Sequence, residues 1–240
     1  MWYLADRMKR LPAAAATLAL GMGAAHAAGL QVKPVGIELQ APAAASKLVL
    51  TNKSRKPITA QVRIFRWKQK NGRDVLERTR MVVASPPLLK MRPRREYIVR
   101  VVRLSKTPVA GEESYRLLVD EVPQRKRRQT GVIFALRYSI PVFFVQPGAT
   151  PPKVSWRARV RNGRLVLMAN NAGQRHEKIS KLRVVLPGGR VKTLFPGLAG
   201  YVLGKSARQW QTPLKVRKGA TITIKGQGIN GPFAAKARVR

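Results

Sequence analysis

Few side chains in this sequence could carry out catalysis. Two pairs of adjacent acids, Glu112-Glu113 and Asp120-Glu121, could in principle supply a general acid and a general base. The first pair follows Gly111 in an expected turn and the second ends an expected strand before Pro123, so we expect neither to be catalytic. The chain has no cysteine and two histidines, which leaves no thiolate and too few ligands for a metal ion. We therefore predict a protein with no catalytic residues, no metal and no cofactor.

The charge of the chain is extreme. Lys and Arg number 48 and Asp and Glu number 10, which gives a formal net charge of +38. Hydrophobic residues nevertheless make up 45% of the sequence, so the chain can bury a core and is not a disordered basic tail. Such a charge would attract nucleic acid, lipopolysaccharide or anionic lipid, and an exported polyanion-binding protein is one hypothesis for its function. No zinc-finger spacing, recognition helix or basic–aromatic motif predicts a specific nucleic-acid partner.

The first 27 residues have the pattern of a secretory signal peptide. Basic residues within 7–10 precede a short apolar stretch at 11–22, and Ala25-His26-Ala27 supplies the small residues that a signal peptidase reads. The apolar stretch is shorter than the roughly 20 residues that span a bilayer, and no later run is longer. We expect cleavage after residue 27, export to the periplasm and no membrane span in the mature chain.

The mature sequence predicts short strands joined by turns. Residues 58–67 are rich in β-branched and aromatic residues, and Asn71-Gly72 after them is a hairpin signal. Residues 154–160 alternate apolar and polar or basic side chains before a second hairpin signal at Asn162-Gly163. No long stretch sustains a helical period. Strands at this spacing predict an all-β protein built from β-sandwiches.

A boundary is predicted around residues 146–152, where prolines and a glycine end a strand and stiffen a linker. We therefore expect three parts, namely a signal peptide (1–27), an N-terminal domain (28–147) and a C-terminal domain (148–240). The last of these carries 20 basic residues and a single acid, Glu177.

The segment from 132 to 145 alternates in a way that matters for function. Its even positions, from Val132 to Phe144, are all apolar or aromatic, so one face of the expected strand is hydrophobic along its whole length. A central strand buried in its own core would have this pattern. Pro141 favours an edge strand instead, because proline cannot donate to a ladder. An edge with an unbroken apolar face usually serves a partner.

Several separated motifs resemble the periplasmic pilus chaperones of the chaperone–usher pathway. They are the Ala-Ser-Pro-Pro-Leu-Leu segment at 84–89, the run at 113–123 and the strand at 136–143. The Ser-Ile-Pro-Val-Phe form of that strand is similar to the branch that assembles thin, archaic-type pili from spore-coat-like subunits. The resemblance implies two immunoglobulin-like β-sandwich domains arranged as an L. It also implies a periplasmic protein that is not an enzyme.

The resemblance further implies donor-strand complementation. A pilin subunit lacks its last strand, and the final strand of the chaperone's first domain fills the groove until another subunit replaces it at the outer-membrane usher. Val132, Phe134 and Leu136 match the donor side chains, and Tyr138 lies on the same face. The same edge could pair with a second copy of the chain when no subunit is bound.

Two basic residues anchor the subunit's C-terminal carboxylate in better-known members of the family. One belongs where this chain has Gly36 and the other near Pro141, and neither position is basic here. Lys33 and Arg137 are candidate substitutes, because a cationic side chain can bind a carboxylate by a charge-assisted hydrogen bond.

The family also often has an ion-pair network between its two domains. Glu121 matches its first acid, whereas Gln146 stands where an arginine is expected, and we expect both at the interdomain contact. The leading hypothesis is a periplasmic chaperone that binds pilus subunits and delivers them to an usher. Polyanion binding is the alternative, and a structural pilin or adhesin that itself enters a fibre is a third class.

Overall fold

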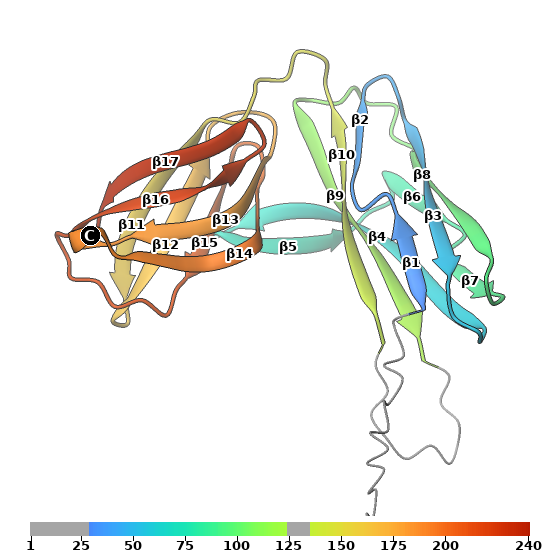
Figure 1. Cartoon of the computed structure of the whole chain (residues 1–240). Coiled ribbons are helices and arrows are strands. Elements are labelled where there is room, and N and C mark those ends of the chain that lie inside the picture. The colour runs from blue at the N-terminus through green and yellow to red at the C-terminus, as the bar shows by residue number, and fades with distance from the viewer. Residues whose placement is uncertain (1–28, 124–134) are drawn as a thin grey trace, which may run out of the picture.

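A computed structural model describes residues 29–123 and 135–240, and these form β-structure almost throughout. Figure 1 shows two pairs of sheets side by side, one built from β1–β10 and the other from β11–β17. We call them the first and second sheet pairs. The all-β fold predicted from the sequence is confirmed. The predicted signal peptide lies outside the described residues.

The first sheet pair holds ten strands. Their bounds are β1 (Leu30–Lys33), β2 (Ile37–Gln40), β3 (Ala45–Asn52), β4 (Ile58–Lys70), β5 (Arg73–Arg78), β6 (Val82–Ser85), β7 (Leu88–Met91), β8 (Glu96–Arg103), β9 (Glu112–Val122) and β10 (Arg137–Val145). One sheet has the order β1-β3-β8-β6 and the other β2-β10-β9-β4-β5, with β7 pairing β4. Leu50, Val99, Leu117 and Val142 are among the buried side chains that fill the space between them.

The β4–β5 hairpin reaches from the first sheet pair to the second (Figure 1). Its turn, Asn71-Gly72, has positive φ at both residues, as the two-residue turn predicted from the sequence requires. The carbonyl oxygen of Gly72 accepts a hydrogen bond of 2.9 Å from the backbone N–H of Gln209. A Cβ atom at position 72 would lie 2.4 Å from the Gln209 side chain, which would have to move, and the positive φ also favours glycine here.

The second sheet pair holds seven strands and a short 3-10 helix. The bounds are β11 (Val154–Arg161), β12 (Arg164–Asn171), β13 (Glu177–Val185), η1 (Pro187–Gly189), β14 (Val191–Val202), β15 (Ser206–Gln211), β16 (Thr221–Gly228) and β17 (Gly231–Arg238). One sheet has the order β11-β12-β15 and the other β14-β13-β16-β17. A separate core lies between them, with Leu165, Leu182 and Ile224 fully buried. Asn162-Gly163 closes the β11–β12 hairpin, as predicted.

No strand lies between Val145 and Val154, where the proline-rich linker was predicted. The two sheet pairs thus have distinct cores on either side of this segment. The domain limits given above and the arrangement as an L stay predictions.

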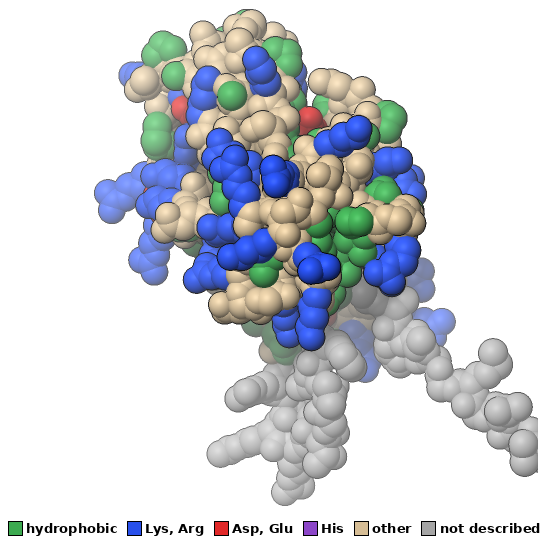
Figure 2. All heavy atoms as spheres, turned by 90° about the vertical axis from the view of Figure 1, so that its left-hand side faces the viewer, with side chains coloured by type: hydrophobic (Ala, Val, Ile, Leu, Met, Phe, Trp, Pro, Cys, Tyr) green, Lys and Arg blue, Asp and Glu red, His purple; other side chains and the backbone are tan. Residues whose placement is uncertain are grey.

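The surface of the second sheet pair is rich in basic side chains. Figure 2 shows Lys and Arg spread over this end of the molecule, with few acidic side chains between them. In the described part of the chain, no helix is long and apolar enough to cross a membrane.

Candidate functional site

Strand β10 changes its surroundings half-way along. From Val142 to Val145 it lies between β9 and β2, and its pairing with β2 is parallel. From Arg137 to Pro141 it pairs with β9, and no second strand of the described residues borders it. This half of β10 therefore presents an unpaired edge whose backbone groups can pair with another strand. Pro141 lies on that edge, as its missing N–H group predicts.

The even-numbered side chains of β10 follow the same division. Ile140, Val142 and Phe144 are buried in the first core, whereas Leu136 and Tyr138 pack against it and are only partly buried. The Tyr138 hydroxyl donates a hydrogen bond of 2.5 Å to the carbonyl oxygen of Leu30. The strand is therefore a buried central strand from Val142 to Val145 and an edge strand from Arg137 to Pro141, so each of the two interpretations of the sequence pattern holds for one half. The remaining expected donor residues, Val132 and Phe134, lie outside the described residues.

The odd-numbered side chains of β10 face the opposite way, over the surface of the sheet that carries Asp120 and Arg116 on β9. Arg137 is the register partner of Asp120, and Pro141 is the partner of Arg116. An added Cβ atom at Gly36 would have Pro141 Cγ as its neighbour at 3.7 Å. The structure therefore brings Gly36 close to Pro141, the positions at or near which the family resemblance places the two anchoring basic residues that this chain lacks.

Asp120 sits between two arginines. Its carboxylate accepts hydrogen bonds from Arg137 Nε and from Arg63 Nη2, the latter at 2.5 Å. Burial alone would raise the pKa of Asp120, but the hydrogen bonds from Arg137 and Arg63 outweigh it and hold the pKa below its ordinary value. Arg137, a predicted anchor, thus already has a carboxylate partner, although its side chain is 63% exposed.

The lowered pKa of Asp120 predicts an acid-sensitive contribution to stability. A carboxyl whose pKa is lower in the folded state stabilises the fold above its ordinary pKa of about 3.9, and this contribution is lost as the pH falls through the folded value. Both arginines are more than one third exposed, so solvent limits the contribution to about 1 kcal/mol or less. We expect Asp120→Asn to flatten the decline of the unfolding free energy below about pH 4, measured by urea titration. An unchanged pH profile in this variant would contradict the assignment.

Arg116 is a half-buried cation of a different kind. Its guanidinium lies 3.7 Å from the centre of the Trp67 ring and 5.2 Å from that of Tyr201, a cation–π arrangement. Its Nη1 donates a hydrogen bond of 3.4 Å to the carbonyl oxygen of Ser139 on the free part of β10. Burial lowers its pKa.

No carboxylate of residues 29–123 or 135–240 lies within 4.0 Å of the Arg116 guanidinium. The side chain is therefore partly desolvated and has no carboxylate in direct contact, although Asp74 attracts it at longer range, and it lies opposite Pro141. Such a group is suited to receive an anion by charge-assisted hydrogen bonds. Sequence reasoning missed Arg116, because the strand register that puts it opposite Pro141 is not visible in the sequence.

A small aromatic cluster joins the two sheet pairs beside Arg116. Trp67 and Phe143 come from the first pair and Tyr201 and Leu203 from the second, and all four are nearly fully buried. The Trp67 and Tyr201 rings meet edge to face with centroids 5.5 Å apart. The Gln69 side chain fixes the same contact, since it donates to the Tyr201 carbonyl oxygen at 2.8 Å and accepts from the Leu203 N–H at 3.0 Å.

A buried polar pair lies next to this cluster. His176 Nδ1 is 2.7 Å from a carboxylate oxygen of Glu112, and the backbone N–H of His176 donates to the same carboxylate. The imidazole ring stacks on Phe143 with centroids 3.6 Å apart. At the rim, Arg175 pairs with Glu38 at 2.5 Å and Arg208 with Asp74. These contacts carry the electrostatic link between the sheet pairs.

Comparison with known proteins identifies the family of this chain. A family model described as the pili and flagellar-assembly chaperone, PapD N-terminal domain, matches residues 29–150, which is more than half of the 240 residues. The chain belongs to this family. Its predicted identity as a periplasmic, non-enzymatic pilus chaperone is thereby confirmed.

Solved structures of pilus chaperones share the fold. The archaic Csu pilus chaperone–tip adhesion subunit complex CsuC–CsuE of Acinetobacter baumannii superposes with a TM-score of 0.69 at 23% identity, covering 89% of this chain and all of the matched one. The CupB2 chaperone of Pseudomonas aeruginosa gives 0.54 at 18% identity, covering 86% and 98%. The SafA pilin–SafB chaperone complex of Salmonella enterica gives 0.58 at 16%, covering 85% and 94%. A comparison with curated proteins finds no match.

Within the described part of the chain, the two residues of this pilus chaperone that were expected at the interdomain contact form their hydrogen bonds inside the first sheet pair. Glu121 is nine residues along β9 from Glu112, about 30 Å away, where its backbone N–H donates to the Leu136 carbonyl oxygen at 2.9 Å. Among the described residues, Glu112 and not Glu121 bonds to the second sheet pair. Gln146 exchanges hydrogen bonds of 2.8 Å with the backbone of Gly111, within the first sheet pair.

The other predicted anchor of the chaperone, Lys33, is exposed at the end of β1. This strand belongs to the opposite sheet, where Lys33 is the register partner of Val49 on β3. Of the two candidate anchors, only Arg137 therefore lies on the face that carries Arg116.

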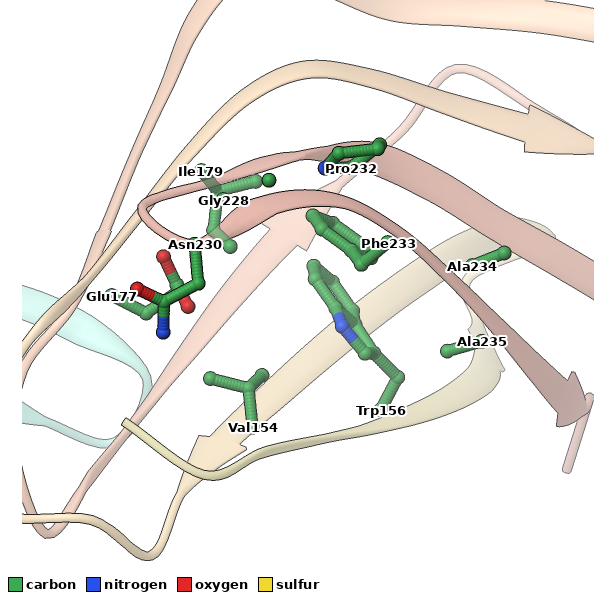
Figure 3. A pocket seen from close by; sticks show the side chains of 11 residues that line it. Val154, Trp156, Glu177, Ile179, Gly228, Asn230, Pro232, Phe233, Ala234 and Ala235 are labelled. Atoms are coloured by element: carbon green, nitrogen blue, oxygen red, sulfur yellow. The ribbon is translucent and has the colours of Figure 1, made fainter. Parts of the chain in front are cut away.

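A pocket of about 270 Å³ opens between β11 and the β16–β17 hairpin of the second sheet pair (Figure 3). Trp156 and Phe233 stack across it with ring centroids 5.5 Å apart, and Trp210 packs on Trp156. Glu177 also lines it, and its carboxylate accepts hydrogen bonds from the backbone N–H groups of Lys178 and Ile229 at 3.0 and 2.6 Å. Because the Trp156 ring already stacks with Phe233 and Trp210, the pocket offers little free stacking surface to a ligand.

Proposed function

We propose that this chaperone binds a pilus subunit by donating the free half of β10 and its preceding segment to the subunit's incomplete sheet. The observation that carries the proposal is the edge from Arg137 to Pro141, which has β9 on one side and apolar side chains on its even face. An outer-membrane usher would accept the subunit, and the subunit would be of the spore-coat-like type. The superposition on an archaic-pilus chaperone complex supports this choice.

The donor side chains would be Val132, Phe134 and Leu136. Each contributes roughly 1.5–3 kcal/mol when fully buried, before the cost of ordering the two chains is subtracted. Tyr138 shares their face, but its hydrogen bond to Leu30 holds it against the chaperone's own core. We therefore propose that Leu136 is the last side chain inserted into the subunit, and that Tyr138 stays on the chaperone's own core. Without a subunit, the same edge could pair with a second copy of the chain.

Arg116 is the residue that we propose as the main anchor for the subunit's C-terminal carboxylate. It is a half-buried cation with no carboxylate in contact among the described residues, whereas Arg137 is paired with Asp120 and Lys33 lies on the other sheet. A carboxylate entering beside Pro141 would balance its charge. Residues 28–147 and 148–240 would form the two domains, arranged as an L around this position.

The proposal predicts that Leu136→Glu prevents subunit capture but not folding. A carboxylate in place of Leu136 would enter an apolar groove without a partner, and we expect at least a tenfold loss of bound subunit. The test is affinity purification of the tagged chain from the periplasm, with bound proteins identified by mass spectrometry. Leu104→Glu is the matched control, because Leu104 is 56% exposed in a loop and outside the edge.

Two results would contradict the proposal. One is normal capture of a pilin-like subunit by Leu136→Glu with an unchanged circular dichroism spectrum. The other is recovery of only salt-sensitive polyanions or unrelated acidic proteins by the wild-type chain. The second result would favour charge, rather than strand donation, as the binding principle.

A further inference from the structure

The outer surface of the sheet β14-β13-β16-β17 carries a regular set of basic side chains. Arg183 on β13, Lys225 on β16 and Lys236 and Arg238 on β17 are all exposed, and we call this set the basic face. Their neighbours along each strand point inward and are buried in the second core, namely Val184, Ile224 and Ala237. The alternation of a sheet therefore places all four charges on one side.

The strand register brings these charges close together. Arg183 and Lys225 are direct register partners on adjacent strands, and Lys236 lies one row further, opposite Thr223. Arg238 is two residues beyond Lys236, about 6.6 Å along the strand. Like charges directly opposite each other destabilise a sheet. Arg183 and Lys225 therefore repel each other in the free protein, and an anionic partner over this face would relieve that repulsion.

No acid compensates for the basic face. Glu177 is the single acidic residue of positions 148–240, and it lies in the pocket of Figure 3 with its carboxylate bound to backbone N–H groups. Within residues 29–123 and 135–240, none of the four basic residues forms a salt bridge. Arg63, Arg103 and Arg137 of the first sheet pair, by contrast, each have a carboxylate partner.

The side chains between the charges are small. The register neighbours of the basic residues are Thr193, Thr223 and Ala234. The long cationic side chains therefore project beyond the short side chains around them. A surface of this form fits a flat array of anions better than a single anion in a groove. The free edge of β10 belongs to the other sheet pair, so contact through the basic face leaves that edge open (Figure 1).

We propose that the basic face docks on the phosphate headgroups of an anionic membrane leaflet. The protein works in the periplasm, where membranes bound the compartment on both sides. Each Lys or Arg near an anionic surface strengthens membrane binding about fivefold. Four such residues on one plane would hold the chaperone weakly and reversibly at the membrane.

The test is vesicle flotation with the exported chain purified from the periplasm, its N-terminus checked by mass spectrometry so that no uncleaved signal peptide contributes. The vesicles contain phosphatidylcholine with about one third phosphatidylglycerol, at about 0.1 M salt, where the screening length is about 10 Å. Pure phosphatidylcholine vesicles are the lipid control. The variant Lys225→Gln/Lys236→Gln/Arg238→Gln removes three charges from the basic face.

A charge-matched control separates a local site from net charge. Lys47→Gln/Lys90→Gln/Arg92→Gln also removes two lysines and one arginine, but from exposed positions of the first sheet pair. We expect the basic-face variant to lower the partition coefficient about 100-fold and the control variant at most several-fold, with subunit capture unchanged in both. Higher salt should weaken binding of the wild-type chain.

Three results would overturn the proposal. Equal losses in the two variants would show that net charge, not this face, attracts the membrane. Equal binding to pure phosphatidylcholine would show that the attraction is not electrostatic. Absence of wild-type binding to the anionic vesicles would mean that the face meets an acidic protein or a soluble polyanion instead.

Discussion

Arg116→Met is expected to abolish stable capture of a pilus subunit while the chaperone stays folded. The methionine side chain keeps apolar contact with Trp67, on which the guanidinium now lies at 3.7 Å. The subunit's carboxylate, however, would be buried beside Pro141 without a cation. Removing one partner of such a charged pair costs about 2–5 kcal/mol, or roughly a 30-fold to several-thousand-fold loss of affinity.

The measurement is the dissociation constant of purified subunit and chaperone, with the natural subunit and with one that carries a C-terminal amide. If Arg116 binds the carboxylate, the amide weakens binding to the wild-type chain but has little further effect on Arg116→Met, because the two changes remove the same interaction. Arg137→Met is the control, since Asp120 already pairs with Arg137. A larger loss for Arg137→Met than for Arg116→Met would identify Arg137 as the anchor.

Local signals in the sequence predicted the strands and turns well. The hairpins at Asn71-Gly72 and Asn162-Gly163 formed where they were expected, because these dipeptides adopt positive φ at low cost. The alternation over residues 132–145 also predicted correctly that Ile140, Val142 and Phe144 share one face. Alternation could not say where the strand stops being central, since this depends on β2, a segment a hundred residues away that pairs only from Val142 onward.

The site residues were harder to predict, because they depend on contacts between distant strands. Arg116 looks like any exposed charge until the register places it opposite Pro141 and under the rings of Trp67 and Tyr201. Glu121 matched a family motif locally, yet the direction of β9 carries it to the opposite end from the junction. Glu112, weighed in the sequence as one of a catalytic pair, instead binds His176 across the junction.

The neighbouring acid, Glu113, forms a buried ion pair inside the first sheet pair. It accepts hydrogen bonds of 2.9 and 2.8 Å from Nε and Nη2 of Arg103, and one of 3.0 Å from the Tyr115 hydroxyl. The side chains of Arg103 and Glu113 are 8% and 11% exposed. Burial alone would raise the pKa of Glu113, but the hydrogen bonds from Arg103 and Tyr115 outweigh it and lower the pKa.

Glu113→Gln is expected to lower the free energy of unfolding by about 3–5 kcal/mol, because it leaves the buried Arg103 guanidinium without a carboxylate. Arg103→Met should cost less, since Glu113 keeps Arg66 Nη1 at 3.7 Å. The double variant Arg103→Met/Glu113→Leu should recover much of this loss, since it removes both charges. Urea denaturation at neutral pH measures the unfolding free energy of all three variants.

The ion pair stabilises the wild-type fold above the ordinary Glu pKa of about 4.3 and loses this effect as the pH falls. Glu113→Gln should therefore also reduce the decline of the unfolding free energy in acid. Losses below about 1 kcal/mol in both single variants would show that the pair behaves as an exposed one.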